Sequence, residues 1–318
     1  MTPAAGREHG AVSAGWVAGS VRARALARRR VGAGPARQLA ASGSLREALA
    51  ALEATCYGRE IRAAQPLAEA QNAVASTILW DMRVLAGWLP RGGVSLLRTL
   101  AGWFEIANVD ELLAQLAGQP ASPAFELGAL ATAWPQLRDA ASPAALRTAL
   151  GRSAWRDPGD DTELAIRLGM RARWAARIAG CGDPARTWAA GAAALLAAAE
   201  QFAQGRPLSP VFLASTAGLL GQPPAEPVAL DKLAGRLPGR ARWALDGVRT
   251  AEDLWRAEAA WWARVERDGF MLLRTSGLDS GPVLGAVAVL AADAWRVRAA
   301  LEAAARGGGA LEAYDAVA

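Results

Sequence analysis

The sequence is poor in the side chains on which many catalytic and metal sites depend. Among its 318 residues there is one histidine, His9, and there are two cysteines, Cys56 and Cys181, which lie far apart and belong to no CxxC pair. A single histidine excludes Ser/His/Asp and Cys/His catalytic arrangements and argues against a His-based metal site. Two distant thiols provide no disulfide framework, so we expect reduced cysteines, as in a cytoplasmic protein.

Long apolar runs, strand patterns and phosphate-binding loops are also missing. Although 53% of the residues are hydrophobic, no apolar run approaches the ~18 to 20 residues that a membrane-spanning helix requires. β-branched residues are scarce and few segments alternate in polarity, which argues against sheet. Neither GxxxxGK[ST] nor a strand-anchored GxGxxG is present, so we predict no cofactor site. Arginines 28–30 precede no apolar segment, and we therefore expect no secretory signal.

The sequence is instead rich in arginine and tryptophan. Its net charge is +5, and basic residues recur between Arg22 and Arg30. No aromatic residue interleaves this run, so a solvated helix face or an acidic partner surface is favoured over nucleic-acid binding, with Arg22 and Arg24 as candidate partner contacts. Among thirteen tryptophans, the adjacent Trp261 and Trp262 cannot both be buried on one narrow helix face, which makes them further interface candidates.

Helix starts are marked by side chains that can cap a helix. A Ser or Asp precedes a Pro, which suits the first helical position, in four places: Ser122-Pro123, Ser142-Pro143, Asp183-Pro184 and Ser209-Pro210. Gly281-Pro282, after Ser280, follows the same plan. Ser44 with Glu47, and Thr250 with Asp253, have the form of capping boxes. Residues 283–290 continue without a turn signal into a longer apolar segment, so helix is favoured over strand there.

The predicted helices repeat along the chain. Residues 96–118 carry leucines at helical spacing and form a helix or a helix pair, and residues 185–205 and 281–309 share its plan of a long apolar helix that ends in glycine. Loops are predicted at residues 90–93, 156–161, 221–227 and 237–239. We therefore predict an all-α protein of three helical units, each about 90 to 100 residues long. The limits are a flexible tail at 1–12 and domains at 13–121, 122–208 and 209–318.

One acidic cluster has two interpretations. Asp157, Asp160, Asp161 and Glu163 could hold a divalent cation in an all-helical enzyme. The same residues are typical of a turn followed by a capped helix, and this second interpretation is favoured.

The residues of the first repeat resemble a known motif. The segment WFEIANVDELLAQLAG is similar to the pattern of phenylalanine, acid, isoleucine, any residue and asparagine before a helix in the C subunit of V/A-type rotary ATPases, a relative of the d subunit of the eukaryotic V-ATPase. Phe104, Glu105, Ile106 and Asn108 occupy the motif positions. The segments GSVRARALARRRVG and GSLREALAALEATCYG resemble the first helix of that family and a short capped helix that ends in Tyr-Gly.

The end of the chain also resembles that family. Gly281 and Pro282 begin an apolar segment that leads to Asp293 and then Arg298, in the order of the closing segment of the family. Two positions depart from it, because Ala294 stands where isoleucine is usual and Arg296 where asparagine is usual. The middle third of the chain carries no matching motif.

The resemblance implies a non-catalytic subunit of the central stalk. It would consist of three similar helical domains that form a funnel with pseudo-threefold symmetry. It would connect the central rotor shaft to the membrane proteolipid ring and transmit torque for coupled ion transport, at the cytoplasmic face of the membrane and through protein contacts. Glu105 and Asn108 would then set the geometry of a repeat and bind no ligand. The alternative is a soluble helical-repeat adaptor that binds a helix or peptide partner.

Overall fold

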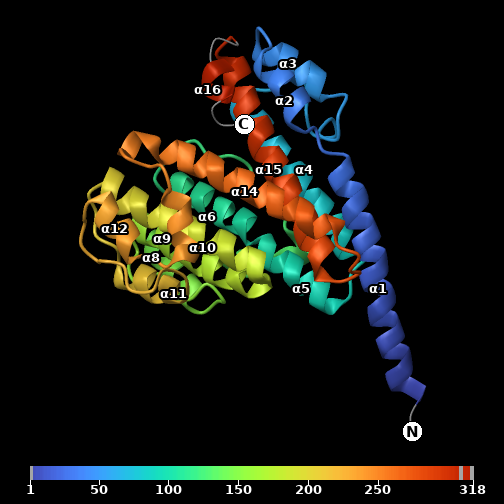
Figure 1. The fold of residues 1–318 in the computed structure, drawn as a ribbon, viewed down its shortest axis with the longest axis horizontal. Helices are drawn as coiled ribbons and strands as arrows, with labels where there is room; N and C mark the ends of the chain where they lie inside the picture. Colours follow the sequence, from blue (N-terminus) through green and yellow to red (C-terminus); the bar gives the residue numbers. More distant parts are fainter. Residues whose placement is uncertain (1–2, 308–310, 316–318) are drawn as a thin grey trace. The chain divides into compact units, whose positions relative to one another are not determined.

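The computed structural model describes residues 3–307 and 311–315, and it is built from helices (Figure 1). Helices account for 71% of the chain, and no strand occurs in the described ranges. The all-α prediction is therefore confirmed. Every helix in these ranges is too short or too polar to cross a lipid bilayer.

The contacts divide the chain into two compact units. Unit 1 comprises residues 1–98, 128–130 and 263–318, and unit 2 comprises residues 99–127 and 131–262. These limits differ from the predicted boundaries at 121/122 and 208/209. The three-domain division and the pseudo-threefold symmetry are not confirmed and stay predictions. Residues 3–12 of the predicted tail belong to a helix, residues 1–2 lie outside the described residues, and the predicted flexibility of this segment is untested.

Unit 1 is organised around one long buried helix, α15 (Ser280–Ala305). Because α15 is apolar almost all round, it is covered on several sides, by α1, α2, α3 and α4. Residues 283–290 are helical, as predicted. The other helices of unit 1 are α1 (Pro3–Arg28), α2 (Ala33–Ala40), α3 (Leu45–Leu52), α4 (Leu67–Ala86), most of α5 (Arg91–Leu100), the 3-10 turn η1 (Gly128–Leu130), the second half of α14 (Leu254–Arg274) and α16 (Leu311–Asp315).

Two glycines allow α14 and α15 to approach closely within unit 1. A Cβ added at Gly285 would lie 2.6 Å from the Gly269 carbonyl oxygen and 2.8 Å from the Cβ of Leu272. The first of these neighbours is backbone, so it cannot move aside as a flexible side chain could.

We expect Gly285→Ala to lower the free energy of unfolding by about 2 kcal/mol, because the overpacking cost exceeds the gain in helix propensity. The matched control is Gly218→Ala, where nothing lies within 4 Å of the added Cβ. That substitution should stabilise the protein by roughly 0.5 to 1 kcal/mol. Urea unfolding followed by circular dichroism measures the free energy of unfolding of both variants. Equal effects of the two substitutions would contradict the inference that Gly285 allows the close approach of α14 and α15.

Unit 2 packs its helices around a core that several short elements share. Buried apolar residues of α6, α8 and α9 meet there, and Trp155 is one of the largest fully buried side chains. The elements are α6 (Gly102–Leu116), α7 (Trp134–Leu137), α8 (Pro143–Gly151), α9 (Glu163–Ile178), η2 (Ala179–Cys181), α10 (Asp183–Ala198), the π-helical turn η3 (Ala199–Ala203), α11 (Pro210–Leu220), α12 (Leu230–Arg236), α13 (Gly239–Arg242), η4 (Trp243–Leu245), η5 (Ala251–Asp253) and the first part of α14.

Most of the predicted helix starts are confirmed. Ser44, Ser142 and Ser209 each accept a hydrogen bond from a backbone N–H three residues on. Thr250 and Asp253 form the predicted capping box, which begins with a short 3-10 turn before α14. At Ser44 the reciprocal bond differs slightly, because Glu47 accepts from the N–H of Gly43.

Two predicted starts are displaced, the first by one residue and the second by two. Helix α10 begins at Asp183 itself, with Gly182 as its N-cap and no side-chain cap. Helix α15 begins at Ser280, and the side chain of Asp279 caps it by accepting from the Gly281 N–H (2.8 Å).

The helix start predicted at Ser122-Pro123 is wrong. Residues 119–127 contain no helix. The N–H groups of Ser122 and Phe125 donate to side chains of α6, Glu111 (2.6 Å) and Asn108 (2.6 Å). Tertiary hydrogen bonds therefore hold this segment extended along α6 and override its local capping signal.

The first patterned stretch, residues 96–118, is a helix pair made of the end of α5 and α6. The two helices meet at Gly102, where a Cβ would lie 2.7 Å from the ring of Trp174. The loops predicted at 156–161 and 221–227 lie outside the helices. Helix α13 begins at Gly239, the last residue of the loop predicted at 237–239, and α5 begins at Arg91, inside the loop predicted at 90–93. That last boundary is therefore wrong by three residues.

Candidate functional site: two buried carboxylate junctions

Glu105 is a fully buried acid on α6. Its carboxylate accepts hydrogen bonds from the backbone N–H groups of Thr132 (2.6 Å) and Ala133 (2.7 Å) and from the indole Nε1 of Trp155 (2.7 Å). All three groups donate, and a deprotonated carboxyl group can accept with both oxygens. The bonds tie α6 to the start of α7 and to the segment after α8.

Other motif residues hold the connection between α6 and α7. The side-chain amide of Asn108 both donates to and accepts from the backbone of Phe125 (3.0 and 2.6 Å). Phe104 packs edge-on against the ring of Phe125, with ring centroids 5.2 Å apart. Ile106 points into the core of unit 2. The motif of residues 104–108 thus fixes how the chain leaves and returns to α6.

Asp293 on α15 is the buried acid of unit 1. Its side chain is fully buried and accepts from the N–H groups of Val31 (3.0 Å) and Gly32 (2.7 Å) and from the Tyr57 hydroxyl (3.0 Å). Gly32 has a φ of 80°, a conformation that favours glycine, and this shape lets two successive N–H groups face one carboxylate. Burial, reinforced by the nearby Asp293 charge, raises the pKa of Tyr57 well above its ordinary value, so the phenol remains a donor.

The two junctions share one hydrogen-bond plan. In each unit a buried acid on a long helix accepts from two successive backbone N–H groups that precede a short helix, and from an aromatic side chain after the next helix. The residues after the short helix are equally spaced in the two units: Ser44, Thr55 and Tyr57 in unit 1, and Ser142, Ser153 and Trp155 in unit 2.

Each member of these triplets plays the same part in both units. The first serine caps its helix by accepting from an N–H three residues on (3.3 and 3.1 Å). The second hydroxyl donates to a carbonyl three residues back (2.7 and 2.8 Å) and accepts from the N–H of the aromatic residue (3.2 and 3.0 Å). The aromatic side chain then donates to the acid. Units 1 and 2 therefore contain two copies of one structural motif.

An arginine accompanies each acid. Arg296, one turn after Asp293, lies 4.0 Å from its carboxylate and makes a bidentate pair with Glu266 (3.1 and 2.6 Å). Burial lowers the pKa of Arg296, but the bonds to Glu266 outweigh this effect and raise it overall. In unit 2 Arg177 lies over the ring of Trp155 (5.2 Å from its centroid), where burial lowers its pKa and the Glu105 charge partly offsets that effect.

The predicted helix ending at Gly205 differs from those at Gly118 and Gly307. Glu200, in η3, is buried and pairs with Arg206 (2.8 and 3.1 Å). Its neighbour Gln201 donates to three carbonyls of residues 224–226. The three predicted endings all have glycine with positive φ, at Gly118, Gly205 and Gly307, but the acid that accepts successive N–H groups occurs in two of them.

The remaining predicted residues lie as follows. Gly281 and Pro282 form the first turn of α15, and Arg298 lies exposed on the same helix. Trp261 and Trp262 are half-buried and pack edge-on, with centroids 4.8 Å apart, and Trp261 donates to the Trp188 carbonyl (2.9 Å). Their role as a partner surface stays a prediction.

Arg22 and Arg24 lie on different sides of α1. Arg24 donates to three carbonyls at and after the end of α14, of Leu273 (3.1 Å), Thr275 (2.7 Å) and Gly277 (3.1 Å), and so holds the turn before α15. Arg22 is exposed and lies over the ring of Trp88, 5.9 Å from its centroid. The structure gives Arg24 a structural role, whereas Arg22 is available at the surface.

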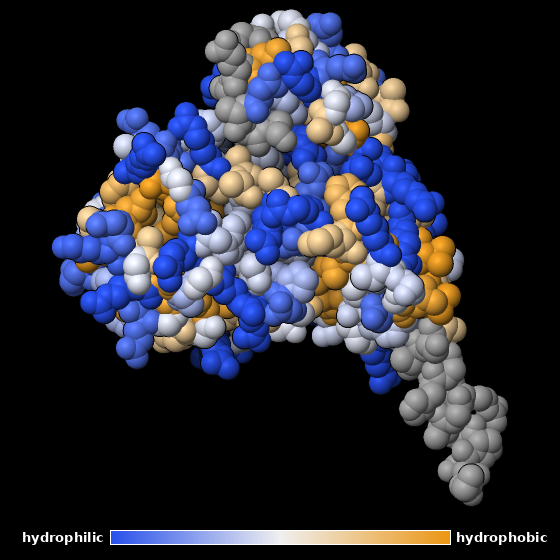
Figure 2. Space-filling view, viewed as in Figure 1, coloured by the Kyte–Doolittle hydropathy of each residue, from blue (hydrophilic) through white to orange (hydrophobic). Residues whose placement is uncertain are grey.

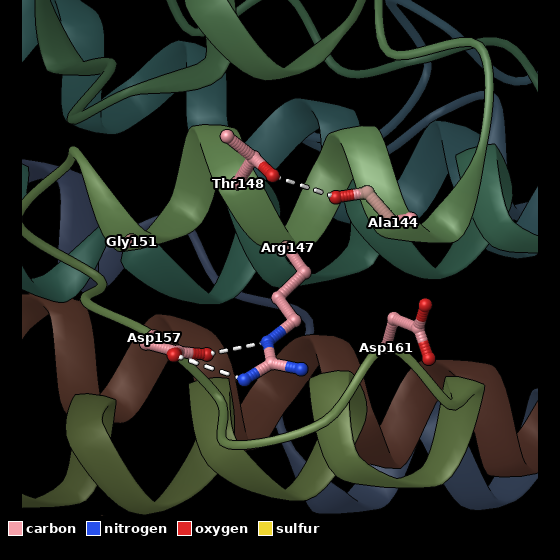
Figure 3. Close-up of a pocket in the computed structure, with 6 residues that line it drawn as sticks. All are labelled: Ala144, Arg147, Thr148, Gly151, Asp157 and Asp161. Atoms are coloured by element: carbon pink, nitrogen blue, oxygen red, sulfur yellow. Dashed lines mark hydrogen bonds and ion pairs between the residues drawn. The ribbon is translucent and has the colours of Figure 1, made fainter.

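The acidic cluster at 157–163 has the geometry of a turn. Arg147 reaches from α8 to Asp157 with two bonds (2.8 and 3.1 Å) in a shallow hollow of about 300 Å³ (Figure 3). The Arg147 bond and the Gly159 N–H lower the pKa of Asp157 to about 2. Thr162 caps α9, as expected for a turn followed by a capped helix. In the described residues, no group of three or more His, Cys, Asp or Glu side chains could hold a metal ion.

Several residues of the junctions were not selected from the sequence. Trp155, Arg296 and the N–H groups of Thr132 and Ala133 all belong to them. Trp155 could have been found, because it follows Ser142 at the spacing at which Tyr57 follows Ser44. No protein-family model and no curated protein sequence matches the chain.

Proposed function

We propose that the chain is a non-catalytic central-stalk subunit of a V/A-type rotary ATPase. In this role it forms a socket that joins the central rotor shaft to the membrane proteolipid ring and transmits torque between them. It lies at the cytoplasmic face of the membrane, and ATP turnover takes place in other subunits.

One observation carries the proposal. The residues that resemble the motif of the rotary-ATPase C subunit are those that build the Glu105 junction, and the same junction recurs around Asp293 in the segment that resembles the family's closing helix. A motif that sets the geometry of a repeat is the role that the resemblance implies for these positions. The repetition supports a body built from related helical units, which is the architecture expected of this stalk component.

The mechanical demand of the role is consistent with these contacts. A protein that transmits torque must resist deformation, and hydrogen bonds that satisfy a buried acid specify and rigidify the packing of the helices around it. Each junction joins three chain segments through one buried acid. The finer architecture, three domains in a funnel with pseudo-threefold symmetry, is part of the proposal.

Affinity purification of the tagged chain from membranes of its source tests the proposal. We expect recovery of the two head subunits, the shaft subunits and the proteolipid ring after mild detergent extraction. Glu163→Ala, at an exposed site, should leave recovery unchanged. A chain that elutes alone, or with unrelated helical or peptide partners, overturns the stalk proposal and favours the adaptor alternative.

A further inference from the structure

The outer face of α1 and α4 in unit 1 exposes large apolar side chains beside arginines. We call it the α1–α4 face, and it comprises Val17, Val21, Arg22, Arg29, Trp80 and Trp88. Val21 is 60% exposed and Trp88 is 51% exposed, which is high for side chains of this size in a soluble domain. In Figure 2 the described part of α1, at the right edge, is hydrophilic toward its C-terminal end and hydrophobic nearer its N-terminal end.

The two helices present these side chains on one surface. Glycines of α1 let it pack closely against the turn that follows α4, since a Cβ at Gly15 would lie 3.1 Å from Pro90 and one at Gly19 would lie 2.2 Å from Leu89. Leu89 and Pro90 directly follow α4, which ends at Ala86 and itself contacts α1. Arg22 of α1 consequently lies over the ring of Trp88.

The arginines of the face converge on a single acid. Asp81 of α4 is half-buried, and burial raises its pKa while the charges of Arg29, Arg22 and Arg59 oppose that effect. Arg59 also stacks on Trp80, 3.4 Å from the ring centroid. Arg59 is also paired with Glu60 (3.1 Å), so three arginines face two carboxylates and this surface keeps an excess of positive charge.

The distribution of charge over the chain points the same way. Within the limits of unit 1 the sequence has nineteen arginines and thirteen acidic residues, whereas unit 2 has sixteen basic and seventeen acidic residues. The net charge of +5 therefore resides in unit 1, the unit that carries the α1–α4 face.

We infer that the α1–α4 face binds an anionic lipid surface directly. Tryptophan prefers the boundary between headgroups and acyl chains, and arginine stems can lie along apolar surface while their guanidinium groups contact lipid phosphates. Val17 and Val21, which are both exposed, supply further apolar contact. Single-stranded nucleic acid would need open ring faces for base stacking, but Arg59 already stacks on the ring of Trp80.

This inference is independent of the rotary-motor proposal, which places the chain at the membrane through protein contacts alone. A direct lipid contact would add a second attachment beside the protein ring. It could also hold if the chain belonged to another membrane-associated assembly.

Co-sedimentation of the purified full-length chain with vesicles tests it without any partner. One set of vesicles contains phosphatidylcholine only, and the other contains about one quarter phosphatidylglycerol. We expect binding to the second set at low ionic strength and its loss in high salt, because the attraction is screened. Neutralising the charge of one arginine should weaken binding roughly fivefold, so Arg22→Glu with Arg29→Glu should weaken it more than tenfold.

Matched variants in unit 2 control for general effects. Arg152→Glu with Arg236→Glu changes the net charge equally at exposed sites. Trp255 is 39% exposed and lies under Arg256, so Trp255→Ala is the control for Trp88→Ala. The inference predicts that Trp88→Ala weakens binding severalfold while Trp255→Ala does not. It is overturned if neutral vesicles bind equally well, if neither set binds, or if variants in the two units have equal effects. Circular dichroism verifies that each variant is folded.

Discussion

Replacing Glu105 by alanine is expected to lower the free energy of unfolding by about 4 kcal/mol, one of the largest single losses available in the chain. The substitution removes an acceptor that satisfies three donors, and it leaves the N–H groups of Thr132 and Ala133 and the indole N–H of Trp155 without partners inside unit 2. Each unsatisfied buried donor costs roughly 1 to 3 kcal/mol. A loss of this size is a large fraction of the stability of an ordinary domain.

Two further variants separate the charge of Glu105 from its shape. Glu105→Gln keeps the volume, but its NH₂ group faces a donor, so we expect a loss of roughly 2 to 3 kcal/mol. Glu163→Ala removes an exposed ion pair with Arg167 one turn away and should cost about 0.5 kcal/mol or less.

Urea unfolding provides the free energies, and amide exchange at Thr132 and Ala133 reports the junction itself. We expect both amides to lose protection in the alanine variant. A Glu105→Ala protein as stable as the Glu163→Ala control would show that the junction contributes nothing.

Replacing Asp293 by alanine is expected to have a similar effect in unit 1, with a loss of about 3 kcal/mol or more. It leaves the N–H groups of Val31 and Gly32 and the Tyr57 hydroxyl without their acceptor, and it removes a negative charge beside Arg296. The exposed pair Arg37–Asp315 provides the control in the same unit. Asp315→Ala should have a much smaller effect than Asp293→Ala, because solvent screens that pair.

A double-mutant cycle with Tyr57→Phe isolates one bond of this junction. Alone, Tyr57→Phe removes one donor and should cost about 1 kcal/mol. In the Asp293→Ala background the hydroxyl no longer has its acceptor, so the same change should cost little or even stabilise. Additive effects in the cycle would mean that the hydroxyl and the carboxylate are not coupled in solution.

Local signals in the sequence were sufficient for most of the helices. Caps at Ser44, Ser142 and Ser209 were predicted correctly because a side-chain acceptor acts within three residues of the bond it makes. Ser122-Pro123 has the same local signal and forms no helix, because Asn108 and Glu111 hold the backbone of this segment from outside it. A local sequence pattern does not show whether tertiary hydrogen bonds will replace the capping bonds that it predicts.

The candidate site was predicted in part. The motif resemblance selected Phe104, Glu105, Ile106, Asn108 and Asp293, and all five are buried. Their partners could not be read from spacing along one helix, since the donors to Glu105 come from 27 to 50 residues away and Tyr57 is separated from Asp293 by 236 residues. The repeated structural motif can be identified only when the hydrogen bonds of both units are compared.

The limits of the two units could not be predicted from the sequence either. The predicted boundaries followed three helix endings in chain order, each marked by glycine. In the structure the last of these helices, α15, packs against α1, α2, α3 and α4 from the other end of the chain. The apolar pattern of a helix does not specify which other helices pack against it, so the limits of the two units could be determined only from the structure.

We propose that this chain couples a rotary head to an ion-conducting ring. The most direct measurement is ATP-driven ion uptake by inverted membrane vesicles from cells with and without the gene for this chain, beside ATP hydrolysis by the head complex in the same cells. The account predicts that uptake is lost without the chain, that head hydrolysis persists, and that re-expression restores uptake. Full ATP-driven uptake in the absence of the chain would contradict it.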